Sequence, residues 1–553
     1  MSDASAIAAH QPSAKEIRLV IAASSAGTVF EWYDFFVYGT LAALIGKAFF
    51  PADNETLQML LVWAGFAVGF GFRPLGAVLF GFLGDRLGRK YTFLVTVSVM
   101  GLATAAIGFI PSAASIGLAA PLIVLTLRIL QGLALGGEYG GATIYVSEHC
   151  APEKRGWYTS FIQASVVGGF VLSVAMVLAC RVSLTPEQFA AWGWRIPFVS
   201  SIAMLAISLW MRLKLSESPV FKAMKAANRT AKNPFKESFT YPGNKKRIFV
   251  ALFGVTGSLT TIFYASFFSS LSFLKGPMRV DPTTVEMLVL VAAPVIMGVF
   301  LWVGRWSDRV GRKIPIIVGN LMILLTIFPA FWLLGGVANP GLKASAKAAP
   351  VTVAGRNCDY DPFANKQATL CGRLLQDLTS LGVPYETTRA VTPIDISPED
   401  PSVFLVMGSS STPLADDVFD NDAARMSLVR KTLESRGYDF SVQHPDWLHK
   451  LGIAALLAWF GILSAFNYGS VAALLSEMFP ARIRYSSMSI PYHIGAGYFG
   501  GFLPVIAGYI VARTGDVYAG LWYTWAFVFI ALIVGWWGIP SGPPKDFSEP
   551  ETA

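Results

Sequence analysis

Two ten-residue segments of this 553-residue chain are near copies of each other. They are GFLGDRLGRK at 81–90 and GRWSDRVGRK at 304–313, and their first residues lie 223 positions apart. Each segment lies between two long apolar runs, so each is a short basic loop joining two membrane helices. A repeat with so long a period predicts two homologous halves, each a bundle of membrane spans.

Composition supports a membrane protein. Hydrophobic residues make up 54% of the sequence, which is more than a soluble core requires, and charged residues make up only 14%. Apolar runs of about 20 residues predict twelve spans, six in each half, at 17–44, 57–82, 91–110, 121–147, 158–180, 193–213, 247–273, 284–303, 314–337, 448–475, 487–512 and 519–539. The expected fold class is an all-α membrane protein with twelve transmembrane helices in two six-helix bundles.

The distribution of Lys and Arg predicts the orientation, because these residues are retained on the cytoplasmic side. The loops that the span order places inside hold most of them, and residues 1–16 lack the pattern of a cleaved signal peptide. Both termini are therefore expected in the cytoplasm, and the net charge of +8 needs no nucleic-acid partner. The expected organisation is a tail at 1–16, a bundle at 17–213, a linker at 214–246, three spans at 247–338, an insertion at 339–447, three spans at 448–540 and a tail at 541–553.

The insertion at 339–447 is too long for a structureless loop. The strand-like run Val403–Met407 and the helix-like segment from Ala423 to Arg436 predict a small extracytoplasmic domain between the ninth and tenth spans. Its two cysteines, Cys358 and Cys371, could form a disulfide bond in an oxidising compartment or remain free thiols. The domain could bind a ligand or partner of its own. The four cysteines of the chain provide no metal framework, and we expect neither a metal nor a cofactor.

Charged residues within the apolar runs are the first candidates for function, because each costs roughly 2.5–3.5 kcal/mol near the bilayer centre. One face of the first span carries Glu31, Asp34 and Tyr38, and one face of the fourth carries Arg128, Gln131 and Glu138. Asp34 and Arg128 lie at similar depth, so they can meet. In the functional interpretation, either Asp34 or Glu31 binds a proton beside Arg128, and Arg128 could also bind an anionic substrate. In the structural alternative, these charges form a static ion pair that holds the two helices together. Glu138 is a further candidate for proton coupling.

Other polar residues in the spans are candidates for contacting substrate: Arg73, Tyr264, Asn467 and His493. Each has a structural alternative. Arg73 could lie too close to the inner surface, and a lone intramembrane histidine is often a hydrogen-bonded structural residue. The glycines of Gly136–Gly141 indicate close helix packing rather than a phosphate-binding loop, because no strand precedes them.

Several motifs resemble a known family. The pair at 81–90 and 304–313 is similar to the signature loops of the major facilitator superfamily, between helices 2 and 3 and between helices 8 and 9. A narrower resemblance lies in FEWYDFFVYG at 30–39, GFRPLG at 71–76, RILQG at 128–132, GGEYGG at 136–141 and EMFP at 477–480, followed by Arg482 and Arg484. Together these look like the metabolite:proton symporter family, which includes permeases for α-ketoglutarate, citrate, shikimate, and proline or betaine. The resemblance covers nearly all of 15–337 and 448–540 and leaves out the insertion.

The resemblance implies two bundles around a central cavity, alternating access, and proton-driven uptake of a small organic solute across a bacterial inner membrane. An organic acid such as a dicarboxylate is the expected substrate, and a zwitterionic osmolyte such as betaine or proline is the alternative. A membrane receptor that senses a ligand through the insertion is more distant. An enzyme is not expected, because no nucleophile, metal cluster or nucleotide loop stands out.

The signature loops also predict an inner gate. Asp85 and Asp308 lie where cytoplasmic loops begin, and each can pair with nearby arginines and a neighbouring helix terminus. Positive-inside retention alone would explain the Arg and Lys residues but not the Asp and Gly residues. The expected gating residues are Asp85, Arg86, Arg89, Asp308, Arg309, Arg312, Glu148, Arg155, Glu477 and Arg482.

Overall fold

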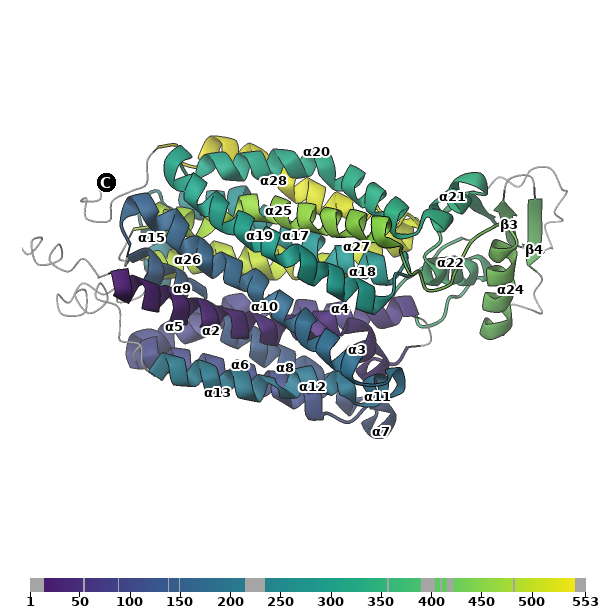
Figure 1. The fold of residues 1–553 in the computed structure, drawn as a ribbon, viewed down its shortest axis with the longest axis horizontal. Helices are drawn as coiled ribbons and strands as arrows, with labels where there is room; N and C mark the ends of the chain where they lie inside the picture. The colour runs from purple at the N-terminus through teal and green to yellow at the C-terminus, as the bar shows by residue number, and fades with distance from the viewer. Residues whose placement is uncertain are drawn as a thin grey trace, which may run out of the picture.

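The computed structural model describes residues 14–52, 55–87, 89–137, 139–148, 150–213, 234–355, 358–388, 403–407, 410–414, 421–480 and 483–542. Two bundles of long helices lie side by side, and a small domain with a sheet projects from one end of them (Figure 1). The first half of the chain forms one bundle, and the second half forms the other.

The first bundle contains α2 (Ala14–Thr40), α3 (Ala42–Phe49), α4 (Glu55–Gly71), α5 (Arg73–Leu87), α6 (Arg89–Phe109), α7 (Ala113–Ile116), α8 (Ala119–Gly136), α9 (Tyr139–Glu148), η1 (Pro152–Lys154), α10 (Arg155–Ser183), α11 (Pro186–Ala191), η2 (Gly193–Arg195), α12 (Ile196–Val199) and α13 (Ser201–Leu213). Glycines let its helices approach closely. A Cβ on Gly132 of α8 would lie 1.7 Å from the carbonyl oxygen of Gly69, and one on Gly136 would lie 2.2 Å from that of Arg73. Backbone contact of this kind stabilises membrane helix pairs and fixes α8 against α4 and α5.

The second bundle contains α15 (Pro234–Thr240), α16 (Asn244–Ala251), η3 (Leu252–Thr256), α17 (Gly257–Tyr264), η4 (Ala265–Ser269), α18 (Ser270–Lys275), α19 (Pro282–Val310), α20 (Lys313–Ala338), α25 (Trp447–Met478), α26 (Arg484–Ile494), η5 (Gly495–Gly500), α27 (Leu503–Thr514) and α28 (Leu521–Gly538). The segments η3, η4 and η5 are π-helical turns within longer helices. Such turns are frequent at functional sites.

Within the described residues, ten helices are long and apolar enough to cross a membrane. They agree with ten of the predicted spans, including 284–303 within Pro282–Val310 and 448–475 within Trp447–Met478. The predicted spans at 17–44 and 91–110 correspond to α2 and α6, which are not among these ten. The apolar part of α6 is the shorter stretch Leu94–Phe109.

The insertion folds as an α/β unit, which contains α21 (Pro340–Ala348), β1 (Val351–Ala354), α22 (Leu370–Leu381), β2 (Tyr385–Thr388), β3 (Val403–Met407), β4 (Ser410–Leu414) and α24 (Asp422–Glu434). The strand expected at Val403–Met407 and the helix expected from Ala423 are thus confirmed. The sheet order is β2-β1-β3-β4, in which β1 pairs parallel to β2 and antiparallel to β3. A disulfide bond joins Cys358 to Cys371, and Arg425 of α24 forms a buried bidentate pair with Asp377 of α22.

The insertion lies against the ends of the membrane helices (Figure 1). Arg513 of α27 donates to Asp359 at 2.8 Å. The Tyr385 backbone N–H donates to Gly515 O at 3.3 Å, and its hydroxyl donates to Ala512 O at 3.3 Å. Ser380 of α22 lies 3.4 Å from the Thr56 hydroxyl of α4, measured between the two oxygens. The insertion therefore contacts both bundles.

Candidate functional site

Two buried arginines of the first bundle share one aromatic ring. Arg73 begins α5 and Arg128 lies in α8, and their exposed fractions are 1% and 0%. The guanidinium carbons of Arg73 and Arg128 lie 4.9 Å and 4.2 Å, respectively, from the ring centre of Phe35. Arg73 also lies over Phe70, and Arg128 lies over Tyr38. The sequence analysis allowed that Arg73 could lie near the inner surface, but the structure places it beside Arg128.

Arg128 is held by a chain of hydrogen bonds that reaches α2. Its Nη1 donates to Gln131 Oε1 at 2.7 Å, and Gln131 Nε2 donates to the Thr104 hydroxyl at 2.6 Å. The Thr104 hydroxyl in turn lies 3.4 Å from the backbone carbonyl oxygen of Asp34. Asp34 itself is buried, as is Glu31. Helical spacing thus correctly grouped Arg128 with Gln131, and direct contact between the Asp34 and Arg128 side chains stays a prediction.

The two guanidinium groups have unused hydrogen-bond donors. The Nε and Nη2 atoms of both Arg73 and Arg128 are buried and have no hydrogen-bond partner in the described structure. Buried polar groups are almost always hydrogen-bonded, and an uncompensated buried cation is costly. The aromatic faces around these arginines compensate part of the charge but accept no hydrogen bond in the ring plane. These buried donors are therefore available to an acceptor that the described residues do not supply.

The second bundle brings its own polar groups toward this region. Tyr264 of α17 packs on Phe70, with 5.3 Å between the ring centres. His493 of α26 is 1% exposed, and neither of its ring nitrogens has a hydrogen-bond partner among the residues that the structure describes. Asn467 of α25 is also buried, and its amide nitrogen would lie 2.8 Å from a Cβ on Gly319, so this side chain faces α20.

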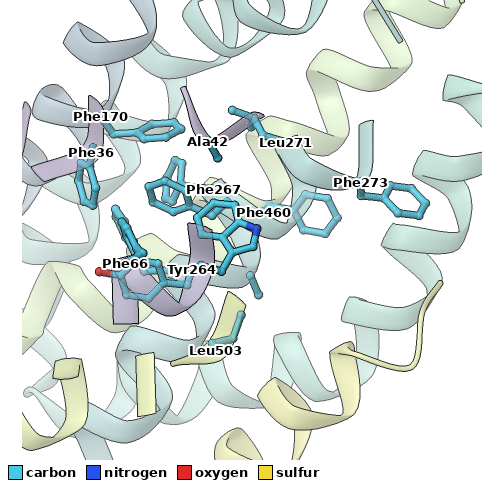
Figure 2. Close-up of a cluster of buried hydrophobic side chains, with 14 of the residues drawn as sticks. Phe36, Ala42, Phe66, Phe170, Tyr264, Phe267, Leu271, Phe273, Phe460 and Leu503 are labelled. Carbon is cyan, nitrogen blue, oxygen red and sulfur yellow. The ribbon is translucent and has the colours of Figure 1, made fainter. Parts of the chain in front are cut away.

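Aromatic side chains from the two bundles meet at the boundary between the bundles (Figure 2). Phe36 of α2 stacks on Phe263 of α17, with 5.6 Å between ring centres. Phe66 of α4 contacts Tyr264 at 5.8 Å, and Phe170 of α10 contacts Phe268 at 5.4 Å. The sequence analysis missed this contact, and the only signal for it was the closely spaced Phe263, Phe267 and Phe268.

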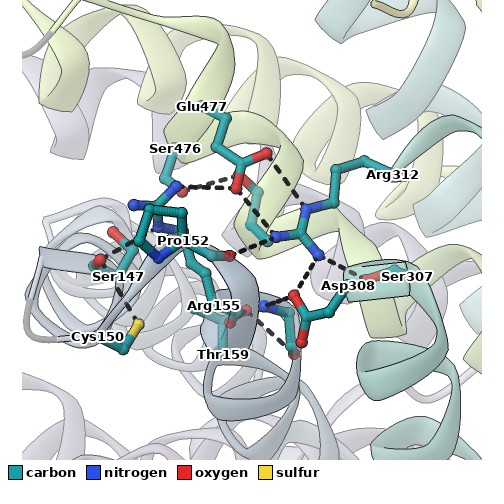
Figure 3. Close-up of polar contacts among 12 residues, drawn as sticks. Ser147, Cys150, Pro152, Arg155, Thr159, Ser307, Asp308, Arg312, Ser476 and Glu477 are labelled. Atoms are coloured by element: carbon teal, nitrogen blue, oxygen red, sulfur yellow. Dashed lines mark hydrogen bonds and ion pairs between the residues drawn. The ribbon is translucent and has the colours of Figure 1, made fainter. Parts of the chain in front are cut away.

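At the other end of the bundles, a carboxylate of the second half binds the first residues of α10 (Figure 3). Asp308 accepts hydrogen bonds from the backbone N–H groups of Gly156 and Trp157, both at 2.8 Å. Its Oδ1 also accepts from Arg312 at 2.7 Å. Gly156 is required here, because a Cβ would lie 2.5 Å from the carbonyl oxygen of Gly304.

A second carboxylate joins the same groups. Glu477 accepts from Arg155 of the first half at 2.9 Å and from Arg312 of its own half at 3.0 Å (Figure 3). Arg484 of α26 pairs with Glu148 of α9 at 3.3 Å. The structure therefore brings together five of the expected gating residues across the boundary between the bundles and adds Arg484 to them.

The remaining expected gating residues are placed differently or lie outside the description. Arg309 is exposed, unlike the buried Arg312. Glu138 and Arg482 lie outside the described residues, as do the side chains of Asp85, Arg86 and Arg89.

Two helical bundles with buried charges and ion pairs between them are typical of a membrane transporter. Comparisons of the sequence and of the fold with known proteins support this class. The family model for "Sugar (and other) transporter" matches residues 19–252. The chain is 39% identical to the shikimate transporter of Escherichia coli over 313 residues, which cover 56% of this chain and 70% of that protein. It is 33% identical to the proline/betaine transporter of Salmonella typhimurium over 325 residues, or 58% of this chain and 65% of that one.

A solved structure shows the same fold. The proton:xylose symporter XylE, bound to 6-bromo-6-deoxy-D-glucose, superposes with a TM-score of 0.61 at 14% identity and covers 96% of this chain and 98% of that one. The chain belongs to the major facilitator superfamily, within the metabolite:proton symporter family, and is an integral membrane transporter of small metabolites.

Proposed function

We propose that this protein is a proton-coupled symporter that imports a small organic anion by alternating access. The observation that carries the proposal is the pair Arg73 and Arg128, buried on the ring of Phe35 with unused donors. A carboxylate can accept two parallel hydrogen bonds from a guanidinium group. Two guanidinium groups so placed suit two acceptor groups on one substrate, and this favours a dicarboxylate or a hydroxylated acid.

The proposed substrate contacts extend beyond the arginines. Gln131 and Tyr38 orient Arg128, Tyr264 and His493 approach from the second bundle, and Asn467 is a more peripheral candidate. Asp34 and Glu31 are the proposed proton carriers, since they are buried in α2, whose Asp34 backbone is linked to Arg128 through Gln131 and Thr104. Glu138 is a third candidate. No metal or cofactor takes part in this proposal.

The ion pairs between the bundles serve as the inner gate in the proposed cycle. Asp308, Arg312, Glu477 and Arg155 close the inner end, and Arg484 with Glu148 adds a second contact. Asp85, Arg86, Arg89, Arg309 and Arg482 are proposed to act with them, by analogy with the repeated loop. The contacts between bundles must break for the centre to open inward.

We infer twelve membrane spans, namely the ten long apolar helices together with α2 and α6. The termini then lie in the cytoplasm of a bacterial cell, and the protein lies in the inner membrane. The 339–447 insertion lies on the extracytoplasmic side, where an oxidising environment is compatible with the Cys358–Cys371 bond. A ligand or partner of the insertion would bind there.

A second candidate substrate is a zwitterion such as betaine or proline. The aromatic cluster favours it, because quaternary ammonium groups bind the faces of Phe, Tyr and Trp, and Phe36, Phe66, Phe263 and Tyr264 gather beside the arginines. The carboxylate of such a substrate would still bind Arg128. A receptor that senses through the insertion is a more distant possibility and would carry no flux.

Uptake by proteoliposomes tests the proposal. Organic acids, amino acids and betaines are screened first by thermal shift, and the stabilising compounds are then offered with and without an inward proton gradient. Arg128→Lys should abolish binding, because an ammonium cannot replace the planar fork. Arg305→Lys is the matched control, since Arg305 is exposed over Trp157. Wild-type affinity in Arg128→Lys would contradict the ligand role, and absence of any flux would favour a receptor.

A further inference from the structure

Helices α10 and α19 form an extensive contact between the two halves, and they run antiparallel. At one end, Gly156 of α10 meets Asp308 of α19. At the other end, Arg181 of α10 meets Glu286 of α19. With a rise of 1.5 Å per residue, these contacts lie roughly 33–38 Å apart along the helices, which is about the thickness of a bilayer core. The same helix pair is thus fastened near both faces of the membrane.

The contact around Glu286 is a three-residue ion cluster. The Glu286 side chain has no exposed surface. Arg181 of the first half binds it through Nε and Nη2, both at 3.1 Å, and Lys275 of the second half binds it at 2.8 Å. The two cations are 26% and 22% exposed, so they connect the buried carboxylate to the surface. The sequence analysis did not single out any of these three residues.

Both ends of the helix pair follow the same rule. Asp308 binds Arg312 of its own half and the α10 backbone of the other half. Glu286 likewise binds Lys275 of its own half and Arg181 of the other half. When the halves separate at either end, the carboxylate keeps the partner from its own half. A buried charge left without any partner would be costly. Because each carboxylate keeps one partner, the contact between the halves can break without leaving a buried charge unpaired.

We propose that Arg181, Glu286 and Lys275 form the outer lock of the transport cycle, reciprocal to the inner contact of Asp308 with Gly156. The proposal rests on the alternating-access function. Opening toward the outside requires Arg181 to leave Glu286 while the inner contact stays formed. Opening toward the inside requires the reverse.

The insertion holds the loop that joins Lys275 to α19. Gln443 exchanges two backbone hydrogen bonds with this loop, donating to Arg279 O at 2.8 Å and accepting from Asp281 N at 3.0 Å. Arg279 also donates from its side chain to Leu381 O at 3.3 Å. Its φ of 54° is left-handed, the only such value among described non-glycine residues, and surrounding contacts must maintain that conformation. The insertion therefore positions two of the three lock residues.

The test measures the distance between the halves at the outer side. Spin labels replace Leu118 in the first half and Val442 next to Gln443, both of which are largely exposed. The background carries Cys150→Ser and Cys180→Ala, so that only the engineered thiols react. Electron–electron double resonance on the full-length protein, without substrate, then gives the distance distribution.

Glu286→Gln and Arg181→Gln should each increase the population at long outer distance. The double variant should do no more than either single variant, because the two residues act through one contact. Glu434→Gln is the matched control, since it removes the carboxylate of the exposed Arg430–Glu434 pair. If Glu286→Gln does not fold, the Arg181→Gln variant alone tests the outer lock. Arg181 is partly exposed, so its replacement is less disruptive to folding.

Unchanged distance distributions in the single variants would overturn the outer lock, whether or not transport is lost. Additive effects in the double variant would overturn it as well. Because no substrate or proton gradient is present, an error in the proposed substrate or coupling ion leaves these outcomes unchanged. The two proposals can therefore fail separately.

Discussion

Asp308 accepts hydrogen bonds from the backbone N–H groups of Gly156 and Trp157, the second and third residues of α10, so a carboxylate of the second half caps a helix of the first half. The N-terminus of a helix favours a negative charge through its unpaired N–H groups and its dipole. The repeated sequence motif therefore supplies a contact between the halves in addition to a basic loop.

Replacing Asp308 by Asn should weaken this contact. The amide keeps the shape but loses the charge, and hydrogen bonds to charged groups contribute about 1.5–3 kcal/mol. The equilibrium should shift roughly ten- to hundred-fold toward the inward-open state. Spin labels at Glu153 and Lys245, which are exposed at the inner ends of the two halves, check this. An unchanged distance distribution would remove Asp308 from the gate.

Gly156→Ala should open the same end by steric means. The added methyl group would lie 2.5 Å from Arg312 Nη1, Gly304 O and Ser307 Oγ, and the backbone oxygen cannot move without its helix. Gly298→Ala in α19 is the control, because no atom of the described part of the chain lies within 4 Å of the added carbon. The labels at Glu153 and Lys245 should separate in the first variant and not in the second. If the labels behaved alike in the two variants, close packing at Gly156 would not be what keeps the inner end closed.

The sequence indicated the charged contacts at the inner end better than those at the centre. Arg155, Asp308, Arg312 and Glu477 were singled out because short loops expose the charge pattern and its repetition, and the structure brings these four residues together, while their role as a gate stays a prediction. Arg128 and Gln131 were grouped because residues three apart share a helix face.

Contacts between distant helices were not predictable in this way. The approach of Arg73 to Arg128 depends on glycine packing between α4, α5 and α8, which no single-helix pattern records. Glu286 looked like one acid at a helix start, because its partners lie on α10 and α18. The aromatic contact between the bundles was hidden by the abundance of phenylalanine in all the spans. The order of the strands in the insertion was also not predictable from the sequence, because which strands pair depends on contacts between segments that are distant in the chain.

Asp34→Asn should uncouple transport. If Asp34 is the titrating group, the variant should lose accumulation against a gradient but keep part of its exchange activity, because the cycle would lose its titrating carboxylate. The measurement is radiolabelled uptake and counterflow in proteoliposomes. Glu31→Gln, one turn earlier in α2, is the parallel variant that decides between the two acids. Full proton-driven accumulation in Asp34→Asn would exclude Asp34 as the carrier.

The disulfide bond should stabilise the insertion locally. Cys358 and Cys371 are separated by 13 residues, and closing a loop of this length contributes about 3 kcal/mol. Cys358→Ser should therefore increase cleavage of the insertion in limited proteolysis, while the membrane bundles stay intact. Cys150→Ser removes a free thiol and serves as the control. Equal proteolysis of the two variants would show that the sheet and helices suffice.

Excising residues 345–440 and joining the ends with a short flexible linker should leave a folded transporter. The insertion buries apolar side chains on its helix and its sheet, among them Leu374 and Leu378 of α22 and Val353 and Leu405 of the sheet. Loop closure depends only weakly on length, so a shorter connection between α20 and α25 is tolerated. The excision removes the Leu381 contact of Arg279, and the outer lock should then close less firmly while uptake continues. Folding and insertion are checked by size-exclusion chromatography and thermal unfolding, and uptake by flux. A variant that folds normally but transports nothing would show that the insertion belongs to the transport path, and the division between bundles and insertion would be wrong.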